Sequence, residues 1–174
     1  YRYGEIEDWD VSNVKNMKEM FMDASSFNQP LNNWNVSNVR DMTRMFVNLT
    51  SFNQPLNNWN VSNVRDMYGM FANAEAFNQP LNNWNVSNDV RYMDGMFYWA
   101  TSFNQPLNNW NVSNVMDMRW MFEVARSFNQ PLNNWNVSKV GVMDSMFGRA
   151  TSFNQPLHAP WYHADSPSTS SESE

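Results

Sequence analysis

An internal repeat constrains the fold of this chain more than any other feature. The phrase Phe-Asn-Gln-Pro-Leu begins at six positions whose spacings are 25, 25, 26, 25 and 25 residues: Phe27, Phe52, Phe77, Phe103, Phe128 and Phe153. Six tryptophans recur with the same spacings: Trp9, Trp34, Trp59, Trp84, Trp110 and Trp135. The one 26-residue unit carries an extra residue near Asp89. A period of this length predicts a solenoid, in which each unit buries its apolar face against its neighbours.

Within one unit, the apolar residues follow two different periods. Trp34 and Val36 alternate with polar residues, which predicts a short half-buried strand. The residues that follow have the i, i+3, i+4, i+7 spacing of one stripe on a helix about two turns long: Met42, Met45, Phe46 and Leu49. Ser37 and Asp41 are suitable polar caps near the start of that helix.

The predicted fold class is therefore an α/β solenoid of six stacked units of about 25 residues. Each unit is expected to contain a strand, a turn and a short helix, and the strands are expected to form a parallel β-sheet. Full helices need about 8–10 Å between axes, so they would curve the array with the strands on the inside. Tight turns in their place would give a straighter solenoid, and the sequence leaves both forms open.

Asparagine and glutamine recur in nearly every unit and need an explanation of their own. In the second unit and the phrase before it they are Asn28, Gln29, Asn32, Asn33, Asn35 and Asn38. Stacked amides form ladders, and Asn satisfies backbone groups in tight turns, so a structural role is favoured. The alternative is a uniform amide surface that hydrogen-bonds sugars.

The repeats divide the chain into a solenoid and its ends. We expect an N-terminal cap at 1–8, the solenoid at 9–157, and a C-terminal cap at 158–165 in which Trp161 and Tyr162 cover the core. Residues 166–174 are polar and acidic, as in a disordered tail. His158 and His163 make a poor ligand set, so no metal site is predicted. Because the chain begins with Tyr1, we interpret it as a segment of a longer protein.

Composition argues against several classes of function. The net charge is −6 and there is no basic run, so nucleic-acid binding is not expected. No apolar stretch approaches the roughly 18 residues of a membrane span, so direct insertion of this segment is not expected. The chain has no cysteine and no glycine-rich phosphate loop. The recurring acid of Asp41, Asp66 and Asp117 suits capping better than acid–base chemistry, so we expect neither an enzyme nor a cofactor.

A site for a specific partner is expected where the units differ from one another. The variable positions are pairs of residues that flank the Met-Phe element, and we place them on the outer helical face. In the third to fifth units this region contributes side chains of the types enriched in binding hot spots: Tyr68, Tyr92, Tyr98, Trp99, Arg119 and Trp120. The alternative is that a solvent-exposed face tolerates any residue, since single exposed aromatics are common.

The repeat resembles the BspA-type bacterial surface-protein repeat, also described as the mycoplasma lipoprotein-associated repeat domain. The likeness rests on Leu-Asn-Asn-Trp-Asn-Val-Ser-Asn-Val-Arg-Asp-Met-x-x-Met-Phe at 31–46, followed by Ser-Phe-Asn-Gln-Pro at 51–55. It implies a leucine-rich-repeat-like solenoid on secreted or lipid-anchored surface proteins that act in adhesion or host interaction. The resemblance implies no catalytic residues.

Repeat, composition and resemblance together predict a non-catalytic cell-surface module for adhesion or protein–protein interaction. The expected partner is an extracellular or host protein. A carbohydrate-binding module and a passive structural spacer are the alternatives. We expect a monomer at the cell surface or secreted, with any anchor outside this segment.

Overall fold

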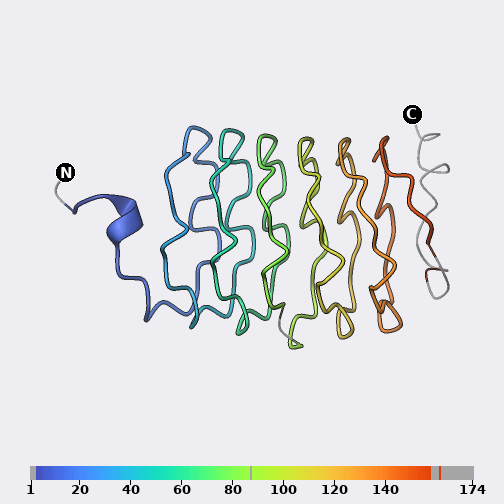
Figure 1. The fold of residues 1–174 in the computed structure, drawn as a ribbon, viewed down its shortest axis with the longest axis horizontal. Coiled ribbons are helices and arrows are strands. Elements are labelled where there is room, and N and C mark those ends of the chain that lie inside the picture. The colour runs from blue at the N-terminus through green and yellow to red at the C-terminus, as the bar shows by residue number, and fades with distance from the viewer. Residues whose placement is uncertain (1–2, 87, 158–160, 162–174) are drawn as a thin grey trace.

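The computed structural model describes residues 3–86, 88–157 and 161, and it shows a solenoid of stacked coils. Successive coils lie side by side in chain order (Figure 1). The predicted stacking of the repeats is confirmed. Within the described residues the only helix is a 3-10 turn, η1, at Ile6–Asp8. No helix in this part of the chain has the length and apolar character needed to cross a bilayer.

The predicted strand around Trp34 and Val36 is wrong. The backbone N–H of Trp34 donates to the carbonyl of Leu31 at 3.0 Å, and that of Val39 donates to Val36 at 3.0 Å. These bonds close two successive turns. The alternation of apolar and polar residues therefore arises from turns that direct Trp34 and Val36 into the core, rather than from an extended strand.

The predicted helix is also replaced by tight turns. The N–H of Met45 donates to the carbonyl of Met42 at 3.2 Å. Arg44, the third residue of this turn, has a φ of 52°, as expected in type II turns and incompatible with a right-handed helix. A second turn at 46–49 has the same form, with a φ of 63° at Asn48.

Hydrogen bonds between coils explain why turns form here instead of helices. The N–H of Arg44 donates to Tyr68 at 2.8 Å, and the N–H of Phe46 donates to Met70 at 2.9 Å. Groups bonded to the next coil are not available for bonds along a helix. The rings of Phe46 and Phe71 lie only 5.4 Å apart, well below the roughly 8–10 Å that packed helices need.

The predicted parallel pairing is present only as isolated bridges, and it lies further along the unit than expected. One bridge residue per coil forms a column: Asn16, Asp41, Asp66, Tyr92, Asp117 and Val142. Asp41 is a cap, as predicted, but of a turn: its Oδ1 accepts the N–H of Thr43 at 2.8 Å. The predicted capping role of Ser37 is wrong, because its own N–H donates to Asn35 Oδ1 at 3.1 Å.

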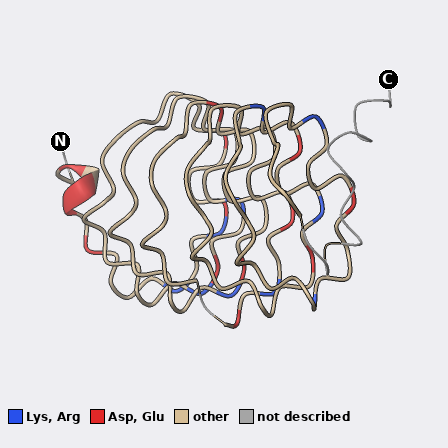
Figure 2. Ribbon diagram, turned by 45° about the vertical axis from the view of Figure 1, so that its right-hand side comes forward, with Lys and Arg blue, Asp and Glu red and all other residues tan. Residues whose placement is uncertain are grey.

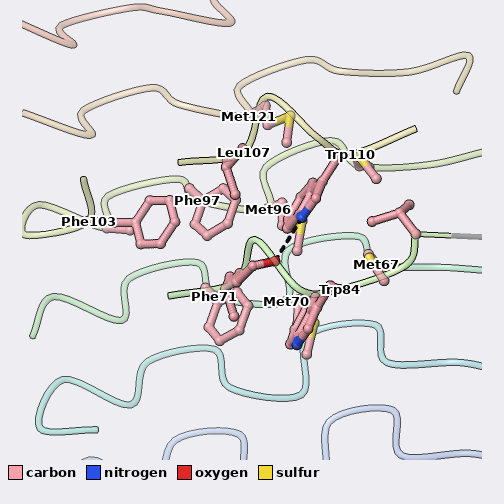
Figure 3. Packing of buried hydrophobic residues seen from close by; sticks show 14 of the residues in the cluster. Met67, Met70, Phe71, Trp84, Met96, Phe97, Phe103, Leu107, Trp110 and Met121 are labelled. Carbon is pink, nitrogen blue, oxygen red and sulfur yellow. Dashed lines mark hydrogen bonds between the residues drawn. The ribbon is translucent and has the colours of Figure 1, made fainter. Parts of the chain in front are cut away.

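Aromatic columns make up the core and keep the solenoid nearly straight. Trp84 and Trp110 stack with ring centroids 6.1 Å apart and planes 4° apart, and both are 2% exposed (Figure 3). Trp110 Nε1 donates to the carbonyl of Leu81 at 3.0 Å. Spacing per coil is similar in the phenylalanine column, at 5.9 Å between Phe52 and Phe77. Similar spacing in separate columns leaves little curvature, so the straighter of the two forms is the one observed.

The recurring amides stabilise the stack, as the structural interpretation predicts. Asn28 Oδ1 accepts the N–H of Asn53 at 2.9 Å, and Asn28 O accepts Nε2 of Gln54 at 3.1 Å. The same bonds recur in later coils, for example from Asn78 to Asn53 Oδ1 at 2.9 Å. These amides are therefore engaged within the solenoid.

Each end of the solenoid continues the tryptophan column. The carbonyl of Ile6 in η1 accepts Nε1 of Trp34 at 2.8 Å, as leucine carbonyls do in later coils. At the other end Trp161 stacks on Trp135 at 6.3 Å. The remainder of the predicted C-terminal cap, with His158, Tyr162 and His163, and the predicted tail at 166–174 lie outside the described residues.

Candidate functional site

The variable positions lie on turns, not on the predicted helix face. The second residue of each variable pair has a positive φ: for example Arg44 at 52°, Gly69 at 56°, Gly95 at 61° and Trp120 at 56°. These four residues occupy equivalent places in four successive coils. Glycine adopts such a conformation without strain, and its missing side chain leaves space above the coil.

Two glycines between larger residues create a groove on this face. Its volume is about 470 Å³, and it crosses the second to fifth coils. It is lined by Arg44, Val47, Tyr68, Gly69, Ala72, Gly95, Tyr98, Trp120 and Glu123. The small residues Gly69, Ala72 and Gly95 come from the two middle coils, so the hollow lies where those coils lack bulk.

Three of the predicted site residues line this groove together. Tyr68 and Tyr98 are each 38% exposed, and Trp120 is 39% exposed. Trp99 is half-buried and lies edge-on to Tyr98, with ring centroids 6.4 Å apart. The guanidinium of Arg126 covers the Trp99 ring at 5.5 Å. Trp99 therefore packs beside the groove and does not line it.

The other two predicted residues have different surroundings. Arg119 Nη2 donates to Asp117 Oδ2 at 2.8 Å, which raises the pKa of Arg119, and its guanidinium lies 5.1 Å from the Trp120 ring. Arg119 thus supports Trp120 without lining the groove. Tyr92 is 44% exposed and lines a separate hollow with Arg65 and Arg91.

Two charged groove residues were missed by sequence reasoning. Arg44 Nη1 forms an ion pair with Glu19 at 3.2 Å, and both side chains are partly exposed. Burial raises the pKa of Glu123, while the charge of Arg149 opposes that shift. Arg44 and Glu123 belong to the variable pairs, so their positions were flagged, but only the aromatic members and Arg119 were selected. The groove thus has aromatic walls with a cation from the second coil and a carboxyl group from the fifth.

Asp94, next to Gly95 in the chain, is a buried acid with an altered affinity for protons. It is 9% exposed, and burial raises its pKa to about 6. The nearby charge of Asp117 raises the pKa further, and Arg119 opposes the shift. Within the described residues no three His, Cys, Asp or Glu side chains cluster closely enough to hold a metal ion.

Comparison with known proteins gives a family but no individual relative. No curated protein and no solved structure matches the chain. The family described as "Mycoplasma protein of unknown function, DUF285" matches it twice, at residues 2–92 and 87–171. The two matches meet in the unit with the extra residue. Because they cover almost the entire sequence, this chain belongs to the DUF285 family and contains two copies of its repeat region.

Proposed function

We propose that this chain is a non-catalytic cell-surface module that binds an extracellular or host protein through the aromatic groove. The observation that carries the proposal is the convergence of Tyr68, Tyr98 and Trp120, from three successive coils, around one hollow. Side chains of these types dominate the binding energy of many protein interfaces. A groove of about 470 Å³ is large enough to accept one or two side chains of a partner.

The rigidity of the stack supports the same proposal. The backbone under the groove is bonded to both neighbouring coils, as in the bonds from Gly69 to Asp94 at 3.0 Å and from Gly95 to Arg119 at 2.7 Å. A preformed site loses little conformational entropy when a ligand binds. The solenoid therefore presents its variable residues on a fixed scaffold.

The BspA-type resemblance supports a surface location and an adhesive role. Proteins with such leucine-rich-repeat-like arrays are secreted or lipid-anchored, and we extend that location to this chain. We propose that the module acts as a monomer and that any anchor lies outside this segment. The core columns already satisfy the apolar surface of the internal coils, so the groove is left for a partner.

A carbohydrate ligand in the groove is the second candidate. Aromatic faces stack on sugar rings, and one half-exposed ring is available from each of three adjacent coils: Tyr68, Tyr98 and Trp120. A passive spacer is the third candidate, in which the groove has no ligand.

Adhesion of the labelled protein to host cells tests the proposal. The triple variant Tyr68→Ser, Tyr98→Ser, Trp120→Ser should reduce cell binding at least about tenfold, because alanine-type truncation of central aromatic anchors costs ~2 kcal/mol or more. Protease treatment of the cells should remove the binding if the partner is a protein. A glycan array identifies the carbohydrate alternative.

A matched variant and a groove-filling variant control for loss of structure. Tyr3→Ser with Met20→Ser also removes exposed apolar groups, 73% and 41% exposed, but far from the groove, and should leave binding unchanged. Gly95→Arg fills the hollow while keeping all three aromatics, and Arg44 shows that the equivalent turn accepts arginine. Cell binding that survives both groove variants would support the spacer instead.

A further inference from the structure

A row of basic residues runs along one edge of the solenoid. Lys15, Arg40, Arg65 and Arg91 occupy the same position in four successive coils. The N–H of Arg40 donates to the carbonyl of Lys15 at 2.7 Å, and that of Arg65 donates to Arg40 at 2.7 Å. The N–H of Arg91 continues the series to Arg65 at 3.4 Å. Parallel backbones paired in this way lie about 4.8 Å apart, so one cation recurs at each step.

The basic row is created by stacking and has no counterpart in a linear search for basic runs. Its members are 25 or 26 residues apart in the sequence. Figure 2 shows blue segments following one another along the lower edge of the ribbon. The row holds four of the 11 Lys and Arg of a chain whose net charge is −6. Lys15, Arg40 and Arg65 are exposed, while Arg91 is half-buried and donates to Asn88 O at 2.7 Å.

A hollow between two of these cations indicates what kind of anion fits. Its volume is about 540 Å³, and it is lined by Arg65, Asp66, Asp89, Arg91 and Tyr92. Guanidinium groups bind carboxylates and sulfates through paired hydrogen bonds. The exposed ring of Tyr92 offers a face on which a sugar ring stacks.

The two carboxylates in the same hollow favour a sugar over a nucleic acid. Carboxylates accept hydrogen bonds from hydroxyl groups, which every sugar unit carries. A phosphodiester backbone would instead be repelled by Asp66 and Asp89, because like charges at short range are unfavourable. The mixture of cations, carboxylates and an aromatic ring therefore matches an acidic sugar chain.

We propose that the basic row and Tyr92 bind a linear acidic polysaccharide that carries a carboxylate or sulfate on successive sugars. The spacing of the coils is close to the length of one sugar unit in an extended chain. Successive anionic groups thus meet successive cations while one sugar ring stacks on Tyr92. This site is separate from the aromatic groove, so either proposal can fail without the other.

Binding of labelled alginate oligosaccharide, which carries a carboxylate on every sugar, tests the proposal by fluorescence anisotropy at several salt concentrations. Arg40→Gln with Arg65→Gln should weaken binding by roughly tenfold, since each exposed ion pair contributes up to about fivefold. The slope of log affinity against log salt should fall by about two, because two fewer counterions are exchanged. Tyr92→Ser should weaken binding without changing that slope.

A gain-of-binding variant guards against simple loss of structure. Met116 holds the next position of the row, with its N–H bonded to Arg91 O at 2.9 Å, and it is 44% exposed. Met116→Arg should raise alginate affinity by roughly threefold and increase the salt slope by about one. Lys18→Gln with Arg126→Gln removes two exposed cations outside the row and should change affinity less than about twofold.

Neutral dextran and a single-stranded oligodeoxynucleotide complete the design. Weak binding of both, relative to alginate, supports the acidic-sugar site. Binding of the oligonucleotide as tight as that of alginate, with no effect of Tyr92→Ser, would overturn it in favour of a general polyanion surface. Equal weakening by the row variant and by the Lys18 and Arg126 control would overturn the location of the site.

Discussion

The replacement of Trp110 by phenylalanine tests whether an indole column holds the coils together. Trp110 is 2% exposed, and its Nε1 donates to the carbonyl of Leu81, itself a buried residue, at 3.0 Å. Phenylalanine cannot donate this bond, and an unsatisfied buried carbonyl costs about 1–3 kcal/mol. The smaller ring also leaves a cavity beside Trp84, which costs a further ~1 kcal/mol. The expected loss of unfolding free energy is therefore about 2–4 kcal/mol.

Guanidinium unfolding followed by circular dichroism measures this loss. For a slope of about 4 kcal/mol per molar denaturant, the midpoint should fall by about 0.5–1 M. The matched control is Trp9→Phe, the same change at the equivalent position of the first unit. Trp9 is 41% exposed, and its Nε1 donates to Tyr3 O at 3.1 Å at the surface. Its replacement should cost under about 1 kcal/mol, because exposed groups regain bonds with water.

The comparison between the two tryptophans decides the result. Equal midpoints for Trp110→Phe and Trp9→Phe would refute the reasoning, because the energy of the column would then not depend on stacking between coils. A loss of stability at Trp110 accompanied by a smaller slope would indicate that unfolding has separated into two steps at the fifth coil, as nearest-neighbour models of repeat proteins allow.

Two further predictions concern the backbone and pH. Gly95→Ala should destabilise the chain by about 1 kcal/mol, because Gly95 has a φ of 61° while the added Cβ would meet only Tyr98 Cβ at an ordinary 3.9 Å. Gly141→Ala, where φ is not positive and nothing lies within 4 Å, should be neutral or slightly stabilising in the same denaturation assay, and equal losses at both sites would contradict this explanation. Asp94 has a pKa raised to about 6, so the folded state binds its proton more tightly than the unfolded state, and stability should increase as pH falls from about 7 towards 4. Asp94→Asn should therefore stabilise by about 1 kcal/mol at pH 7, allowing for solvent screening, and by nothing at pH 4, whereas a difference independent of pH would exclude the burial of a charged Asp94 as the cause.

The sequence determined the solenoid, its period and its core columns. Identical residues at a fixed spacing, such as Trp84 and Trp110, bury their apolar surface best against their own copies. The same reasoning gave the structural role of Asn28 and its equivalents, since a ladder needs the same amide in every coil. It also placed Tyr68, Tyr98 and Trp120 in one variable region, although it could not show that they share a groove.

The local conformation was decided by contacts between coils. The spacing of Met42, Met45 and Phe46 fits a helix stripe, but the same residues can face inward from a series of tight turns. Gly69 and Gly95 at equivalent positions gave one usable signal, because glycine there is typical of a turn with positive φ. That signal was outweighed by the helical period and by the non-glycine residues in the other units.

The surface sites depend on which distant residues the stacking brings together. Arg40 and Arg65 are 25 residues apart in the sequence, yet the bond between their backbones brings them to adjacent coils. Gly69 and Gly95 likewise form one floor only because their coils are neighbours. The sequence specifies each unit and the fact that units stack. The three-dimensional spacing of about 5 Å per coil decides which side chains meet, because it excludes helices and aligns equivalent positions into columns.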